Sequence, residues 1–236
     1  MNSVCSENEI PLTGARWAAK AEAYGSLIAE HLSPDTVWLD AGCGSRLLEA
    51  DMDLLENWLV GHCKKIVGMD VSVSSHRNIK ELVEGSLYKL PFEDASFDLI
   101  TCNMVIEHLE NPENAFSEVA RCLRPNGAFV ANTPNLMNYG VLANAVATRI
   151  MPEKLRLRMV HGSDGRAPDD IFPVQYKANT MRRLVQLLRA SGLQIHKAIH
   201  LEQQRPFFRK TGPLEKLFMK ATPFSGLLVC AHRQSA

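Results

Sequence analysis

Short apolar segments, each ending in a polar or glycine-rich turn, alternate with segments of helical periodicity along the first half of the chain. Strands joined through helices need crossover connections, so they pair in parallel and are covered by helices on both faces. The predicted strands are residues 37–39, 65–69, 82–85, 97–102 and 128–132, the last following a break at residues 125–127. The alternation therefore predicts a doubly wound, mainly parallel α/β sheet.

Helical periodicity indicates the segments that would cover this sheet. An N-terminal helix is expected over residues 15–31, where Ser33-Pro34 ends it. A second helix is expected through residues 47–59, a third over residues 114–123, and an amphipathic one over residues 180–190.

The rest of the chain divides into an insertion and a final unit. Residues 135–178 lose the alternation and collect Pro, Gly, Asp and Arg, which predicts a lid or a substrate-shaping insertion. Strands at residues 193–201 and 227–231 would complete a sheet of about seven strands with an antiparallel last strand. We expect a single domain over residues 1–236, made of a helical cap (1–33), a cofactor-binding core (34–134), the insertion and the final unit (179–236).

Composition narrows the choice of partners. The 26 basic and 26 acidic side chains cancel, so no overall charge attracts the chain to nucleic acid or to an anionic membrane. The six cysteines form no Cys-x-x-Cys pair, which argues against a disulfide framework or a zinc ribbon. The N-terminus has no signal-peptide pattern, and no apolar run approaches the roughly 18 residues of a membrane span. We expect a cytoplasmic protein with no nucleic-acid partner and no membrane span.

Polar residues and glycines gather where the predicted strands end. Open parallel sheets bind ligands beyond the carboxyl ends of their strands, and glycines there let the backbone turn tightly beside a ligand. Asp70 closes the second strand 26 residues after Gly44, where a carboxylate can accept hydrogen bonds from ribose hydroxyls. The strand-end candidates are Asp40, Gly42, Gly44, Asp70, Ser86, Leu87, Asn103 and Thr133.

The charge at the first turn distinguishes two ligands that contain a ribose. A nicotinamide dinucleotide prefers Gly-x-Gly-x-x-Gly, but Leu47 occupies the third glycine position, and Asp40 would repel a pyrophosphate. S-adenosylmethionine has no phosphate and carries a sulfonium and an ammonium group, which a nearby carboxylate stabilises. The charges therefore select S-adenosylmethionine as the cofactor.

Five motifs follow one another in order through the predicted core. Residues 37–44 (VWLDAGCG) form the first and residues 66–72 (IVGMDVS) the second, and residues 90–98, 105–109 and 123–127 form the other three. In order and spacing these motifs resemble those of class I methyltransferases, most closely the small-molecule type 11 group. The resemblance covers about residues 37–134 and implies a Rossmann-like fold that transfers a methyl group from S-adenosylmethionine.

The resemblance also implies a role for each strand-end residue. The methionine part of the cofactor would be held at the first turn by Asp40, Gly42 and Gly44. The ribose would be bound at the end of the second strand by Asp70 and Val71. The adenine would lie beyond the third strand beside Ser86 and Leu87, and the sulfonium would face Asn103 at the end of the fourth.

Two residues depart from the family pattern. Ser45 stands where a third glycine is common, which should leave binding intact. Ser86 stands where an aspartate often accepts the adenine amino group, so we expect somewhat weaker cofactor binding.

Methyl transfer is an in-line displacement that relies mainly on positioning, so a general base matters only for an acceptor such as a hydroxyl. His108 and His161 are the catalytic candidates, with Glu107 and Asp169 or Asp170 as further options. The alternative for His108 is to cap or pack the start of a helix.

No metal site is expected, because His196 and His200 share a strand face without a carboxylate partner. The basic segment 149–158 would suit an anionic or lipid-linked acceptor, or else it forms a solvated helix face. The expected acceptor is an O or N atom of a small molecule such as a sugar, a lipid-linked intermediate or a secondary metabolite.

Two other functions remain open. Ser45 and Ser86 are compatible with a regulatory protein that binds S-adenosylmethionine without turnover. The glycine turn and the strand-end acid are shared with NAD-dependent oxidoreductases, the third hypothesis.

Overall fold

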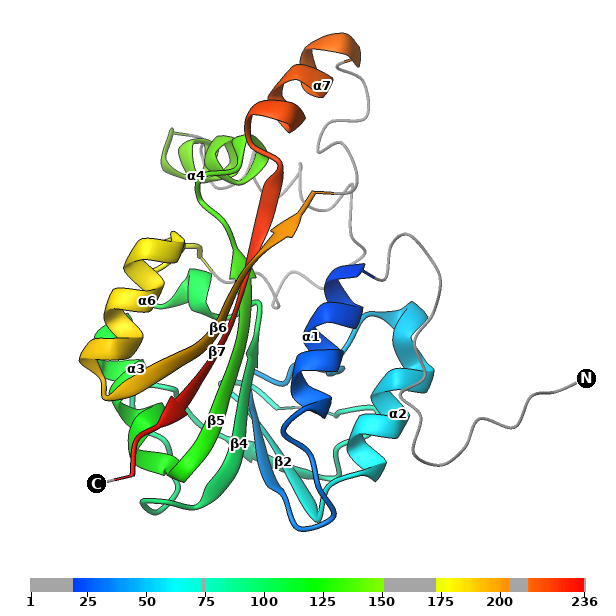
Figure 1. Ribbon diagram of the computed structural model, residues 1–236, viewed down its shortest axis with the longest axis vertical. Coiled ribbons are helices and arrows are strands. Elements are labelled where there is room, and N and C mark those ends of the chain that lie inside the picture. The colour runs from blue at the N-terminus through cyan, green and yellow to red at the C-terminus, as the bar shows by residue number, and fades with distance from the viewer. Residues whose placement is uncertain (1–18, 74, 151–172, 204–211, 236) are drawn as a thin grey trace, which may run out of the picture.

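The described chain is built around one sheet of seven strands (Figure 1). The computed structural model describes residues 19–73, 75–150, 173–203 and 212–235. The strands are β1 (Val37–Ala41), β2 (Lys65–Asp70), β3 (Glu81–Glu84), β4 (Phe97–Asn103), β5 (Leu123–Pro134), β6 (Leu193–Glu202) and β7 (Phe224–Arg233). Their order is β3-β2-β1-β4-β5-β7-β6. The first five pair in parallel and β7 is antiparallel to both of its neighbours, which confirms the predicted sheet.

Helices cover both faces of the sheet. On one face lie α1 (Ala19–Ala29) and α2 (Asp53–Gly61), and on the other lie α3 (Pro112–Cys122) and α6 (Met181–Ala190) (Figure 1). Two further helices, α4 (Tyr139–Ile150) and α7 (Gly212–Ala221), lie beyond the end of the sheet at which β5 terminates (Figure 1). Within the described residues, no helix combines the length and the apolarity needed to cross a membrane.

Each face of the sheet buries its own apolar cluster, because successive side chains of a strand point to opposite faces. Trp38 and Val130 pack with α1 and α2, whereas Leu39 and Phe129 pack with α3 and α6. All four side chains are at most 1% exposed. Burial on both faces explains why the strands are apolar at consecutive positions.

Side-chain caps set the start of two helices. The side chain of Asn111 accepts a hydrogen bond from the Asn114 N–H at 3.1 Å, and Pro112 occupies the first helical position of α3. The Thr180 hydroxyl accepts from the Arg183 N–H at 3.3 Å before α6. Consequently α3 begins two residues before the predicted 114, and α6 begins one residue after the predicted 180.

The prediction of one helix through residues 47–59 is wrong at its start. Leu47 and Leu48 lie in a loop, and a 3₁₀ turn, η1 (Ala50–Met52), precedes α2. The Leu48 N–H donates to the buried Glu56 carboxylate at 3.0 Å, which holds the loop against α2. Leu47 is buried in the core beside α1 and α2, so its apolar character reflects packing of the loop.

The break predicted at residues 125–127 is a bulge inside β5. Phe97 pairs with Leu123, but Leu99 pairs with Ala128, so the residues between Leu123 and Ala128 loop out of the ladder. Asn126 adopts a positive φ of 65° within this bulge. The strand therefore begins at Leu123 instead of residue 128.

Among the described residues, two helices lie where none was predicted. The helix α4 falls in the segment 135–178 that was expected to be irregular, and α7 lies between β6 and β7. The helix α1 ends at Ala29, two residues before the predicted 31, and residues 15–18 of that prediction lie outside the described residues.

Candidate functional site

The turn after β1 packs closely against the Val105 side chain in the β4 loop. Gly42 has a φ of +82° and Gly44 one of +51°, a region that favours glycine. The N–H groups of Gly42 and Cys43 donate to the Met69 carbonyl at 2.7 and 3.1 Å. A Cβ atom on Gly42 would lie 2.2 Å from Cγ2 of Val105, so no larger residue fits at this position.

Asp70 lies at the carboxyl end of β2 and faces this turn. Its Oδ2 accepts a hydrogen bond from the Gly44 N–H at 2.8 Å, and its Oδ1 accepts from the Val71 N–H at 2.7 Å. Each carboxylate oxygen can accept a further hydrogen bond. The two backbone donors therefore hold the Asp70 carboxylate in place, and each of its oxygens can still accept a hydrogen bond from a ligand with paired hydroxyls.

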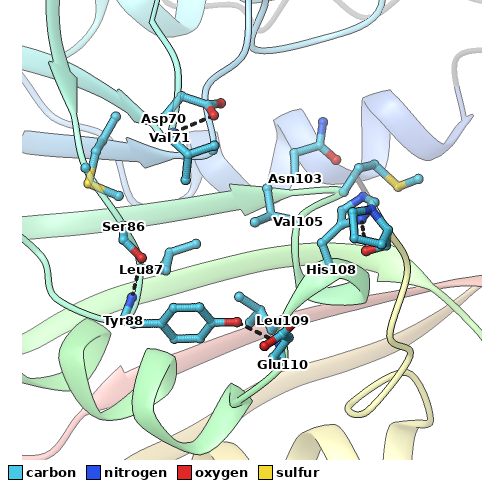
Figure 2. A pocket seen from close by; sticks show the side chains of 15 residues that line it. Asp70, Val71, Ser86, Leu87, Tyr88, Asn103, Val105, His108, Leu109 and Glu110 are labelled. Carbon is cyan, nitrogen blue, oxygen red and sulfur yellow. Dashed lines mark hydrogen bonds between the residues drawn. The ribbon is translucent and has the colours of Figure 1, made fainter. Parts of the chain in front are cut away.

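A cavity of about 500 Å³ opens beside Asp70, within the size range of small-molecule sites. In Figure 2, Asp70 and Val71 lie across the cavity from Tyr88 and Leu109, with Ser86 on one side. The predicted site residues that line it are Gly42, Asp70, Val71, Ser86, Leu87, Asn103 and His108. Thus strand-end positions far apart in the sequence meet around one cavity.

The wall beyond β3 is mostly apolar with few polar groups. Leu87 and Leu109 supply apolar surface, and the Ser86 hydroxyl accepts a hydrogen bond from the Tyr88 N–H at 3.2 Å. The Tyr88 hydroxyl accepts from the Glu110 N–H at 2.6 Å, which joins the β3 and β4 loops (Figure 2). Sequence reasoning missed Tyr88, Leu109 and Glu110 as cavity residues, although they follow the same strand ends as the residues it identified.

Asp40 lies beneath the turn and lines neither this cavity nor the second cavity described below. It is only 2% exposed, and its Oδ1 accepts a hydrogen bond from the Thr101 hydroxyl at 2.7 Å. The pKa of Asp40 is raised to about 7: burial is the main cause, the bond from Thr101 opposes it, and the nearby Glu56 and Asp70 carboxylates add to it. A direct contact of Asp40 with the methionine part of a cofactor stays a prediction.

A second cavity, of about 360 Å³, shares Asn103 and Met104 with the first. The Asn103 side chain accepts from Asn132 Nδ2 at 2.9 Å and donates to the Leu47 carbonyl at 3.4 Å. Met104 has a positive φ of 57°, and its N–H donates to the Asn132 carbonyl at 2.9 Å. Asn103 and Met104 thus form a fixed boundary between the two cavities; Tyr24 lies on the wall of the second.

His108 and Glu107 lie in a 3₁₀ turn, η2 (Ile106–His108), after β4. His108 lines the first cavity, and its Nδ1 lies 3.1 Å from the Pro173 carbonyl. Glu107 is 3% exposed and accepts from the Thr133 hydroxyl at 3.0 Å. Thr133 lines the second cavity, so Glu107 is linked to that cavity and His108 to the first. His161, Asp169 and Asp170 lie outside the described residues.

Comparison with known proteins identifies this core. The family model described as "Methyltransferase domain" matches residues 39–131, which span β1 to β5. This core is a class I methyltransferase domain.

Relatives and solved structures agree with the methyltransferase domain. A protein of Mycolicibacterium smegmatis named a probable S-adenosylmethionine-dependent methyltransferase is 29% identical over 146 residues, which is 55% of this chain and 54% of that protein. A ubiquinone/menaquinone biosynthesis C-methyltransferase of Brucella anthropi is 40% identical over 72 residues, 28% of this chain and 27% of that protein. The chain therefore matches about half or less of these relatives' lengths.

The fold of the methyltransferase domain is shared more widely. The crystal structure of an S-adenosylmethionine-dependent methyltransferase of Methanosarcina mazei superimposes with a TM-score of 0.56 at 18% identity, covering 89% of this chain and 98% of that one. At this identity the likeness establishes the fold.

Proposed function

We propose that this chain binds S-adenosylmethionine in the first cavity and transfers its methyl group to an O or N atom of a small molecule in the second. When bound, S-adenosylmethionine supplies an electrophilic methyl group on a sulfonium centre. The observation that carries the proposal is the meeting of the two cavities at Asn103 and Met104. A nucleophile on one side of this boundary can face a donor on the other, as in-line displacement requires.

The residues of the first cavity fit the adenosine half of the cofactor. Asp70 would accept hydrogen bonds from the ribose hydroxyls with the acceptor capacity that Gly44 and Val71 leave. Leu87 and Leu109 would pack against the faces of the adenine. The absence of a Cβ at Gly42 lets the turn pack against Val105 at the edge of the cavity, and Asp40 beneath the turn favours a cationic group.

The second cavity offers groups that would orient an acceptor. Asn132 and Thr133 line it at the carboxyl end of β5, and Tyr24 of α1 closes one side. The Asn132 amide is already oriented by its hydrogen bond to Asn103. These side chains would position the acceptor and exclude water, which are the main contributions in a methyl transfer.

For a hydroxyl acceptor, the proton would leave through Thr133 to Glu107. The Thr133 hydroxyl donates to Glu107 and accepts from Asn179 Nδ2 at 2.7 Å, so its orientation is fixed. His108 Nε2 lies 4.0 Å from Glu107 Oε1. In this proposal His108 interacts with Glu107 and does not contact the acceptor.

A carbon acceptor is the second candidate, because the Brucella anthropi relative is named a C-methyltransferase of quinone biosynthesis. The two alternatives differ in where a proton is lost: a hydroxyl acceptor loses it from the attacking oxygen, whereas an ionised phenolic ring loses it from the ring carbon after that carbon has received the methyl group. Both use the same cofactor site.

The test is an assay of S-adenosylhomocysteine formation by the purified chain with a panel of hydroxyl, amine and quinol acceptors. We expect turnover with a hydroxyl or amine acceptor and loss of turnover in Asp70→Asn. Turnover confined to quinols would replace the O or N acceptor with carbon. Binding of S-adenosylhomocysteine without turnover on any acceptor would support a regulatory binding protein, and binding of NAD alone would revive the oxidoreductase.

A further inference from the structure

A group of metal-ligating side chains lies at the end of the sheet opposite the two cavities. Within the described residues, His31, Cys230 and His232 present ligand atoms that all lie within 4.8 Å of one another. His232 pairs with Ala128 of β5, whereas Gly226, which lines the second cavity, pairs with Pro134. Six residues of strand separate these positions, a distance of roughly 20 Å. The group is therefore distinct from the proposed methyl-transfer site.

The distances within the group fit a tetrahedral ion. Cys230 Sγ lies 3.2 Å from His31 Nε2 and 3.8 Å from His232 Nε2. With Zn–S of about 2.3 Å and Zn–N of about 2.0–2.1 Å, two ligand atoms of a tetrahedral zinc site are separated by about 3.6 Å when one is sulfur. The two measured distances lie on either side of this value.

The surrounding structure holds two of these ligands in place. Cys230 is fully buried on β7, between β5 and β6, so the position of its sulfur is set by the sheet. The other ring nitrogen of His232, Nδ1, lies 3.3 Å from the Asn126 carbonyl in the β5 bulge. Such a bond to a backbone carbonyl fixes the tautomer of a metal-bound imidazole and directs its Nε2 to the ion.

His196 is positioned to supply a fourth ligand. A bulge in β6, where the pairing shifts between Ile195 and Lys197, places this residue beside the group. Its ring centroid lies 5.2 Å from that of His232 and 6.5 Å from that of His31. His200, the other histidine of β6, lies instead beside Phe224, with ring centroids 5.1 Å apart and ring planes tilted by 41°.

We propose that His31, His196, Cys230 and His232 form a binding site for one Zn²⁺ ion. A thiolate with imidazoles is a donor set that suits zinc. Binding replaces the thiol proton of Cys230 with a sulfur–zinc bond and releases that proton to water. The ion would join α1, β6 and β7 and so connect the N-terminal helix to the last strand.

The electrostatic surroundings are compatible with a cation. Glu30 and Lys197 are the charged residues next in sequence to His31 and His196. Lys197 Nζ itself bonds Glu30 Oε1 at 2.7 Å, which offsets its repulsion of the ion.

The test is a titration of chelator-treated, full-length protein with Zn²⁺ against a chromogenic competitor, followed by Co²⁺ as a spectroscopic probe. We expect one equivalent of Zn²⁺ at submicromolar affinity and a sulfur-to-cobalt charge-transfer band. Cys230→Ser and His232→Gln should each weaken binding at least a hundredfold, and Cys230→Ser should remove the band.

Matched controls separate this site from adventitious binding. Cys63→Ser and His200→Gln alter a half-buried thiol and a β6 histidine outside the group, so they should leave both readouts unchanged. Retained binding of S-adenosylhomocysteine would show that Cys230→Ser and His232→Gln still fold. No stoichiometric binding, or binding that Cys230→Ser and His232→Gln leave intact, would overturn the proposal. Unchanged affinity in His196→Ala would overturn the assignment of the fourth ligand.

Discussion

In the proposed cofactor site, Asp70 is the residue whose carboxylate should contribute most to binding. Asp70→Asn keeps the size of the side chain and one acceptor for the neighbouring backbone donors but removes its charge. Because hydrogen bonds to charged groups contribute about 1.5–3 kcal/mol, the Kd for S-adenosylhomocysteine should rise by roughly 10- to 150-fold. Isothermal titration calorimetry measures this change. Asp35→Asn, at an exposed position before β1, is the matched control, and equal affinities of the two variants would place the ribose elsewhere.

The raised pKa of Asp40 predicts that the stability of the folded protein depends on pH. Its folded pKa is about 7, above the ordinary 3.8, so the folded state binds more protons than the unfolded state between these values. The contribution of Asp40 to the free energy of unfolding therefore falls as pH rises from about 4 to 7, by up to ~1.4 kcal/mol per pH unit, and then stays constant.

Asp40→Asn should remove this part of the slope, because the amide does not ionise and can still accept from the Thr101 hydroxyl. Urea unfolding at several pH values between 4 and 8 gives the comparison. A wild-type slope equal to that of the variant would mean that Asp40 is not protonated below pH 7 in the folded protein.

At the scale of elements, the contact between the β1 turn and the β4 loop has no room for a side chain. Gly42→Ala would place a methyl group against Val105 and impose a φ of +82° on alanine. The left-handed conformation alone costs roughly 1–2 kcal/mol, and the steric overlap adds to it. We expect a lower free energy of unfolding and at least tenfold weaker binding of S-adenosylhomocysteine.

The double variant Gly42→Ala with Val105→Ala tests the steric part of this explanation. Removing the Val105 methyl groups should restore part of the stability but not the part that the backbone conformation costs. Gly61→Ala is the control, since a Cβ there meets no atom within 4 Å. If the double variant were no more stable than Gly42→Ala, overlap with Val105 would not be the cause.

Strand ends were the part of the site that could be predicted from the sequence. Gly42, Asp70, Leu87 and Asn103 follow apolar strands, and parallel pairing brings the carboxyl ends of such strands together. Asp40 also stands at the end of a strand, but it is buried beneath the turn. A strand-end position in the sequence does not determine whether the side chain points into the cavity or into the core.

The second cavity and the histidine–cysteine group could not be predicted in this way. Tyr24 and Gly226 line one cavity from opposite ends of the chain, and His31 and Cys230 approach within 3.2 Å across 199 residues. Such contacts depend on how α1 packs on β7, and no local spacing encodes that packing. Likewise, Leu47 matched helical periodicity because packing of a loop also needs apolar residues.

At the scale of the whole molecule, α1 connects the two ends of the sheet. Tyr24 lies on the wall of the second cavity, while His31, just beyond the last residue of the helix, belongs to the proposed zinc site. The zinc site is about 20 Å from the second cavity by strand length, without shared ligand residues. Stabilisation by Zn²⁺ and by S-adenosylhomocysteine should therefore be nearly additive, since effects at sites more than about 10 Å apart usually are.

A ligand that binds only the folded state must raise the stability of the whole chain. At a free concentration 100 times its Kd, S-adenosylhomocysteine should contribute about 2.7 kcal/mol, which corresponds to a rise in Tm of roughly 5–11 °C for a chain of this size. Differential scanning fluorimetry measures the shift. At the same ligand concentration, Asp70→Asn should show a much smaller shift and Asp35→Asn the full one, whereas an equal shift in all three proteins would mean that the stabilising ligand binds away from Asp70.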